Sequence, residues 1–178
     1  VKMETSATSP LILFGGIGMI LVALGFILYA VVRRLGRSFL GFGMLMWVVT
    51  VLAKFVWAIP LNSRIYAVLI AAFPGALGSG LFDLYVGLLT GFTEVAIVWL
   101  ILRFTRLGKN VSWEHALAFG IGFGAFEALV LGLGSFVSTL SVLLAPQSIP
   151  SDRLAQVLQQ TNLWYGLAAI VERFFTVW

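Results

Sequence analysis

The sequence predicts an all-α protein that crosses a membrane several times. Of its 178 residues, 61% are hydrophobic and only 10% are charged, whereas an ordinary soluble domain is about half apolar and about a quarter charged. The apolar residues also come in long uncharged runs, and a run of about 18 or more can cross a bilayer as a helix. We therefore expect a multi-pass transmembrane helical bundle that forms one integral membrane domain over residues 1–178.

Five apolar stretches are candidates for membrane segments. The first is too long for a signal-peptide core and has no small-residue cleavage pattern after it, so we expect it to be retained as a helix. The second is stopped by Pro60 and the polar stretch that follows it. A short polar helix in a loop is expected at 152–161, between the last two runs. The five apolar stretches cover residues 11–32, 38–59, 66–102, 113–145 and 163–178.

The third stretch can be divided in two ways, because Pro74 and several glycines interrupt it near its start. It either crosses twice or forms a short re-entrant or interfacial segment at 66–79 followed by one crossing from about residue 80. Basic residues cluster at 33–37 and at 103–109, and such clusters gather on the cytoplasmic side. Three crossings before residue 103 put both clusters on one side. The distribution of basic residues therefore favours the short segment at 66–79, a total of about five spans and an N-terminus on the outer side of the membrane.

Composition narrows the range of partners and chemistries. The net charge is +4, but the basic residues lie at the ends of apolar runs, so we expect a lipid bilayer and no nucleic acid as partner. The chain contains no cysteine, which excludes disulfides, thiol catalysis and thiolate metal ligands. His115 is the only histidine and lies about 18 Å along the helix from Glu127, too far to share a metal ion. Metal dependence and cofactors stay open.

Three carboxyl groups fall near the middle of the predicted membrane. A charge there costs at least about 2.5–3.5 kcal/mol on insertion scales, so each one needs a reason. With a rise of about 1.5 Å per residue, Glu94, Glu127 and Glu172 all reach mid-membrane depth on three different helices. Two of them end the same pattern, Gly-x-x-x-Gly-x-x-Glu, whose glycines stand at 87, 91, 120 and 124. This spacing places each glutamate on the glycine face of its helix.

Glycine faces let helix backbones approach closely, so we expect these two helices to pack through them and to bring Glu94 and Glu127 together. One protonated and one ionised carboxyl can act as acid and base toward a water. The alternative is that protonated glutamates hydrogen-bond between helices and hold the bundle. Both interpretations predict that the two carboxyl groups point into a helix seam.

Three other ionisable residues lie within the apolar runs. Lys54 and Asp83 both lie toward the predicted outer side, where they can pair, or Lys54 can extend to the interface, in a structural role. Arg173 follows Glu172 directly, so the two side chains point about 100° apart on the helix. We therefore expect Arg173 to meet a carboxylate of another helix rather than Glu172.

At these helices the sequence resembles the YhfC family of predicted intramembrane proteases, relatives of PrsW and of the CAAX-protease and bacteriocin-processing group. The resemblance covers about residues 80–178 and rests on three blocks in the family's order. These are Gly-Phe-Thr-Glu at 91–94, Gly-Ile-Gly-Phe-Gly-Ala-Phe-Glu-Ala at 120–128 and Glu-Arg at 172–173. The family's second glutamate, its arginine and one histidine correspond here to Val95, Val98 and Phe123. A further histidine would fall beyond residue 178, and the chain ends within an apolar run, as expected for a fragment that is incomplete at its C-terminus.

The resemblance implies a glutamate that activates water, with histidines that bind metal or the oxyanion. Three functional hypotheses follow. The first is an intramembrane endopeptidase, a hydrolase that is active or has lost its activity. In it Glu94 is the general base, Glu127 its partner, and Glu172 with Arg173 orients them, while the substrate is a membrane protein or peptide. The second is a small proton-coupled transporter that uses the same carboxyls. The third is a non-catalytic membrane scaffold. We expect any of them to reside in a bacterial or archaeal cell membrane.

Overall fold

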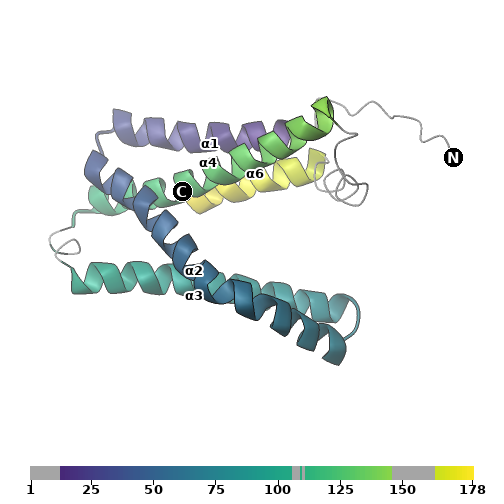
Figure 1. The fold of residues 1–178 in the computed structure, drawn as a ribbon. Helices are drawn as coiled ribbons and strands as arrows, with labels where there is room; N and C mark the ends of the chain where they lie inside the picture. The colour runs from purple at the N-terminus through teal and green to yellow at the C-terminus, as the bar shows by residue number, and fades with distance from the viewer. Residues whose placement is uncertain (1–12, 106–108, 110, 146–162) are drawn as a thin grey trace. The chain divides into compact units, whose positions relative to one another are not determined.

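Five helices make up the structure, a computed structural model that describes residues 13–105, 109, 111–145 and 163–178 (Figure 1). No strand occurs in these ranges, so the predicted all-α fold class is confirmed. The predicted polar helix at 152–161 lies outside the described residues. The helices are α1 (Phe14–Val32), α2 (Arg37–Ala72), α3 (Ala76–Phe104), α4 (Trp113–Leu144) and α6 (Leu163–Val177).

Four of these helices, α1 to α4, are long and apolar enough to cross a membrane. The fifth, α6, has 15 residues and a length of about 22 Å at about 1.5 Å per residue. The third candidate span, α3, ends at Phe104, beside the second basic cluster, so three candidate spans separate the N-terminus from that cluster, the odd number that the distribution of basic residues favours. The protein is therefore an integral membrane protein.

The chain forms two compact units, which are described separately. The first contains residues 1–44 and 113–178, and the second contains residues 45–112. The start of α2 belongs to the first unit and the rest of α2 to the second.

In the first unit, α1, α4 and α6 lie side by side (Figure 1). Small residues allow these contacts. A Cβ at Gly16 of α1 would lie 2.8 Å from the backbone nitrogen of Phe136, and one at Gly132 of α4 would lie 3.0 Å from that of Ile20. Ala118, Ala125 and Ala128 are fully buried on the same helix α4. Apolar helices gain little from burying apolar area in lipid, so close backbone packing of this kind holds them together.

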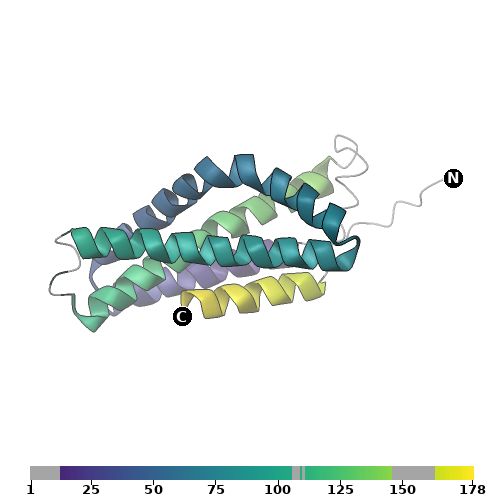
Figure 2. The ribbon, with the colours of Figure 1, turned by 90° about the horizontal axis from the view of Figure 1, so that it is seen from below.

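The expected end of the second helix at Pro60 is wrong. In the second unit α2 continues through Pro60 to Ala72, and Figure 2 shows that it is curved. A proline inside a transmembrane helix removes one backbone hydrogen bond and bends the helix without ending it. Residues 66–79 are therefore no separate segment: they form the end of α2, a turn at 73–75 and the start of α3.

The turn between α2 and α3 uses one glycine with a left-handed backbone, Gly75 at φ 81°. A side chain at Gly78 would collide with the carbonyl oxygen of Phe73, so this glycine lets the two helices meet directly after the turn. Further along, the rings of Tyr66 and Phe82 pack with centroids 5.1 Å apart. The second unit is thus an antiparallel helical hairpin.

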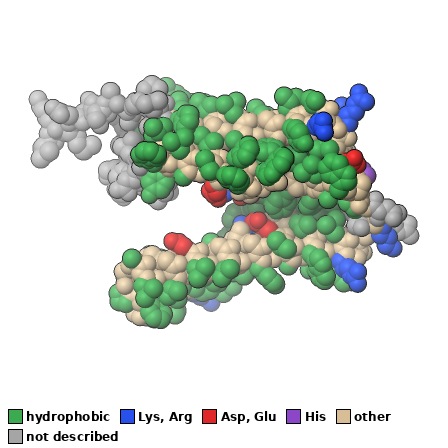
Figure 3. Space-filling view, turned by 180° about the vertical axis from the view of Figure 1, so that it is seen from behind, with side chains coloured by type: hydrophobic (Ala, Val, Ile, Leu, Met, Phe, Trp, Pro, Cys, Tyr) green, Lys and Arg blue, Asp and Glu red, His purple; other side chains and the backbone are tan. Residues whose placement is uncertain are grey.

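On the face shown in Figure 3, hydrophobic side chains are spread over both units and charged side chains are few. Exposed apolar residues run along the full length of α3, from Leu77 to Phe104. Such a surface fits a lipid environment.

Candidate functional site

Arg173 joins two of the predicted site residues in the first unit. Its Nη1 lies 2.9 Å from Glu127 Oε1, so α6 forms an ion pair with α4. Its Nη2 donates a short hydrogen bond to Glu172 Oε1 on its own helix. The expectation that Arg173 meets a carboxylate of another helix is confirmed, whereas the expectation that it avoids Glu172 is wrong. One guanidinium thus bridges two carboxylates.

The three side chains differ in exposure. The side chain of Arg173 is 12% exposed and that of Glu127 is 22% exposed, while that of Glu172 is 63% exposed. Arg173 and Glu127 are thus mostly shielded within the unit, and Glu172 faces outward. Nη1 of Arg173 is buried and has no partner in hydrogen-bond geometry among the described residues, although Glu127 is near.

Gly124 explains how α6 comes close enough for the ion pair. A Cβ at Gly124 would lie 3.0 Å from the Cα of Val177, so only glycine admits the α6 backbone at this point. Val177 follows Arg173 by one helical turn, and Gly124 precedes Glu127 by about one turn, so the backbone contact and the ion pair lie side by side. The Phe174 ring packs on Phe26 of α1 with centroids 5.3 Å apart and fixes the other side of α6.

The partner of Gly124 corrects the predicted packing. We expected the glycine faces of the helices that carry Glu94 and Glu127 to pack against each other, but Gly124 packs against α6. Side chains at Gly120, Gly87 and Gly91 would meet no other atom within 4 Å. Within the separate units, the pattern Gly-x-x-x-Gly-x-x-Glu thus marks one helix contact, at Gly124.

Glu94 lies in the second unit and pairs with Lys54 of α2. Lys54 Nζ donates a hydrogen bond to Glu94 Oε1 at 3.1 Å, and the two side chains are 21% and 18% exposed. The pairing of Lys54 with Asp83, one of the two alternatives that the sequence left open, is therefore wrong, and Asp83 is exposed on α3. Because Glu94 and Glu127 belong to different units, their predicted adjacency stays a prediction.

The sequence did contain a signal for the Lys54–Glu94 pair. The turn of the hairpin is centred on Pro74, and Lys54 and Glu94 each lie 20 residues from it. Tyr66 and Phe82, which also touch, each lie eight residues from the same proline. Reading the two helices as one antiparallel hairpin would have predicted both pairs.

A catalytic metal ion does not fit the residues that the structure describes. In the described ranges no three His, Cys, Asp or Glu side chains gather at a point that could hold a metal ion. Glu127 and Glu172 do converge, but on a guanidinium that occupies the position a cation would take. His115 stacks on Phe39 with centroids 4.3 Å apart and takes no part in the cluster.

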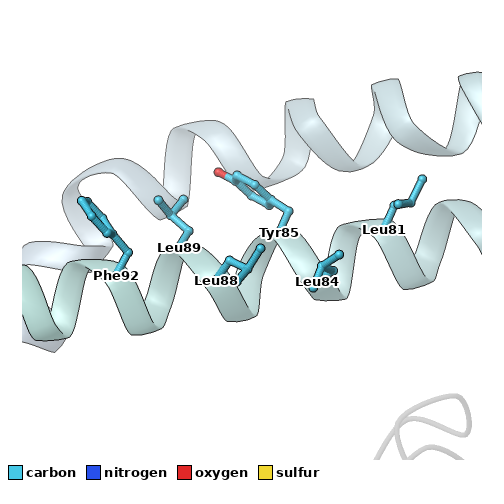
Figure 4. A pocket seen from close by; sticks show the side chains of 6 residues that line it. All are labelled: Leu81, Leu84, Tyr85, Leu88, Leu89 and Phe92. Atoms are coloured by element: carbon cyan, nitrogen blue, oxygen red, sulfur yellow. The ribbon is translucent and has the colours of Figure 1, made fainter.

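An apolar depression runs along α3 (Figure 4). It is lined by side chains of α3 alone, namely Leu81, Leu84, Tyr85, Leu88, Leu89 and Phe92. No charged side chain lines it, and the phenol of Tyr85 is its one polar side-chain group.

The apolar helices and the ion pairs between their side chains define the class of the protein. It is an integral membrane protein with ion pairs between its helices. The comparison with protein families then identifies the family, because the YhfC intramembrane metalloprotease family matches residues 18–177. This match spans most of the chain, so the protein belongs to the YhfC family and is protease-like. No curated protein and no solved structure matches it.

Proposed function

We propose that this protein hydrolyses peptide bonds of membrane-embedded or membrane-adjacent segments, and that its glutamates activate the attacking water. The observation that carries the proposal is the convergence of Glu127, Glu172 and Arg173 within apolar helices of a protease-like family. Ionisable groups inside a membrane are expensive and mark functional sites by default. A purely structural contact between α4 and α6 would not require three of them.

In the proposed reaction Glu94 is the general base and Glu127 is its partner carboxylate. Glu127 is held in place by its ion pair with Arg173, at 2.9 Å. The carboxylate takes a proton from water, the hydroxide oxygen bonds to the peptide carbonyl carbon, and the C–N bond breaks as the proton passes to the leaving amine. Adjacency of Glu94 and Glu127 is part of the proposal.

Arg173 has a second role in this proposal. A tetrahedral intermediate carries a negative oxygen that needs hydrogen-bond donors, and removing one such donor typically lowers the rate by about 10²–10³-fold. The histidine of the family pattern is replaced by Phe123. Arg173 carries a positive charge and a guanidinium with five N–H donors, so it is suited to bind that oxygen. No step is assigned to a metal, because the described residues do not form a site for one.

The test uses the purified protein in lipid vesicles of neutral and anionic phospholipids, with quenched fluorescent peptides that contain an apolar transmembrane segment. We expect the parent to cleave at least one peptide, and Glu127→Gln and Glu94→Gln to lower the rate by about 10²-fold or more. Glu114→Gln is the matched control, since Glu114 lies in the first turn of α4, away from the cluster. Cleavage by Glu127→Gln at the parent's rate, or no cleavage of any peptide by the parent, would overturn the proposal.

Two broader expectations belong to the same proposal. The substrate is a membrane protein or peptide held in the lipid bilayer, because the glutamates lie in apolar helices. The membrane is that of a bacterial or archaeal cell. Fractionation of cells that express the protein, followed by detection of its cleavage products, tests both.

A further inference from the structure

We propose that Lys54 is a positioning residue that pairs with Glu94 and aims its carboxylate within the membrane, so that Glu94 is ready to accept a proton. This inference rests on the proposed function, because Glu94 is the general base there. It takes Lys54 out of the structural role in which the sequence placed it with Asp83. Both residues lie in the second unit.

The contact itself is specific. Lys54 Nζ lies 3.1 Å from Glu94 Oε1, within hydrogen-bond distance, and joins residues 40 positions apart in the chain. About four-fifths of each side chain is shielded, at 21% and 18% exposure. An ion pair on an open surface is worth little, but a shielded one decides whether its members carry charge.

Other contacts between α2 and α3 also bring Lys54 and Glu94 to the same position along the hairpin. Lys54 and Glu94 lie 12 residues from Tyr66 and Phe82, respectively, and these rings touch at 5.1 Å. The same register continues to the turn, where Gly78 packs directly on the backbone of Phe73. The ring contact and the turn contact therefore fix how far along the two helices Lys54 Nζ meets the Glu94 carboxylate.

That depth is well inside the membrane. Glu94 precedes Arg103 by nine residues, which is about 14 Å along α3 and close to half of a hydrocarbon core about 30 Å thick. A lone carboxylate at such a depth takes up a proton, since hydrocarbon disfavours the charged form. A protonated Glu94 cannot act as a base. A cation within hydrogen-bond distance reverses this preference.

Lys54 also supplies a positive charge that α3 itself does not place near Glu94. No basic residue lies within four positions of Glu94 on α3, where Val95 and Val98 occupy its C-terminal side. The neighbouring residue Thr93 donates its hydroxyl to the carbonyl oxygen of Leu89 on its own helix and so does not serve the carboxylate. Among the described ion pairs, the charge that balances Glu94 comes from α2.

The test reads the ionisation of Glu94 directly. Difference infrared spectra between the protein and its Glu94→Gln variant isolate the Glu94 carboxyl group at pH 7. We expect the carboxylate band in the parent and in Lys54→Arg, and the protonated carboxyl band in Lys54→Met. Arg64→Met is the matched control, because it removes one exposed cation from the same helix and should leave Glu94 ionised. A Glu94 that stays ionised in Lys54→Met, or that is protonated in the parent, overturns the inference.

Cleavage assays separate this inference from the proposed function. We expect Lys54→Met to lower the cleavage rate by about 10²-fold, as Glu94→Gln does, and Lys54→Arg to retain most of it. The charge exchange Lys54→Glu with Glu94→Lys should restore thermal stability but not cleavage, since the base then lies on α2. If the infrared bands are as expected but the parent cleaves no peptide, the proposed function is refuted and the inference about Lys54 stands. Equal cleavage by the parent and Lys54→Met refutes the inference alone.

Discussion

Arg173 Nη1 lies 2.9 Å from Glu127 Oε1, so the contact between α6 and α4 includes an ion pair inside the membrane protein. In lipid, apolar side chains do not distinguish one helix neighbour from another, because lipid tails are equally apolar. The ion pair and the backbone contact at Gly124 do distinguish them. Together they select one register of α6 on α4.

Replacing Arg173 should show how much the packing of α6 on α4 depends on the ion pair. We expect Arg173→Met to lower the free energy of unfolding by up to about 3 kcal/mol, because it leaves the Glu127 charge largely shielded and unpaired. Partial exposure of both side chains, 12% and 22%, keeps the loss at the low end for a buried pair. Thermal unfolding in mild detergent measures it. Glu172→Gln is the control: its side chain is 63% exposed, and we expect a change within about 0.5 kcal/mol. Equal stability of Arg173→Met and the parent would contradict the role of the ion pair.

The crossing of α1 and α4 should be sensitive to one glycine and tolerant at another. A Cβ at Gly132 would lie 3.0 Å from the backbone nitrogen of Ile20, whereas one at Gly134 would meet nothing within 4 Å. We expect Gly132→Leu to push α1 away from α4 and to destabilise the protein by about 1–3 kcal/mol. Gly134→Leu, two residues along the same helix, should leave stability nearly unchanged. The same unfolding assay compares the two variants, and similar losses in both would argue against close packing at Gly132.

The two basic clusters should lie on one side of the membrane. The chain has no cysteine, so single cysteines can be introduced without removing others. We expect Arg33→Cys and Lys109→Cys to react with an impermeant maleimide from the same side of sealed vesicles. Phe73→Cys, in the turn between α2 and α3, should react from the opposite side. Labelling of Arg33→Cys and Lys109→Cys from opposite sides would show an even number of crossings between the N-terminus and residue 103.

The register of the hairpin can be tested without reference to activity. We expect a short bifunctional maleimide to crosslink the double variant Tyr66→Cys with Phe82→Cys, since the two rings that these cysteines replace pack at 5.1 Å. Tyr66→Cys with Leu84→Cys is the control, because Leu84 is 57% exposed and lines the apolar depression of α3. The ratio of crosslinked to free protein on a denaturing gel gives the answer. Crosslinking of the control pair at equal yield would mean that α2 and α3 slide on each other.

The ends of the helices were predicted accurately from the sequence where apolar runs meet polar residues. The run at 113–145 corresponds to α4, Trp113–Leu144, and the run at 163–178 to α6, Leu163–Val177. The prediction failed at Pro60, because a proline that ends a soluble helix is tolerated inside a membrane helix. Local composition cannot distinguish these two outcomes, whereas the neighbouring helix can stabilise the bent one.

Pairings between helices were predicted less well than the helices themselves. The glycine pattern correctly marked Gly124 as a close contact, but a periodic face does not say which helix it receives, and α6 took the place expected for α3. Lys54 was paired with Asp83 by depth alone, although symmetry about Pro74 points to Glu94. Arg173 was predicted to reach another helix, and it does so while also binding Glu172.

The course of α2 through Pro60 affects how this helix exchanges its amide hydrogens. Proline has no N–H, so the carbonyl of Val56 lacks the donor that every other turn of the helix supplies. The side-chain oxygen of Asn62, two residues beyond the proline, is buried and has no hydrogen-bond partner among the described residues. A buried acceptor without a partner attracts any donor that reaches it, water included. Deuterium should therefore enter α2 first around residues 56–62, which makes this segment the point at which the hairpin opens most readily.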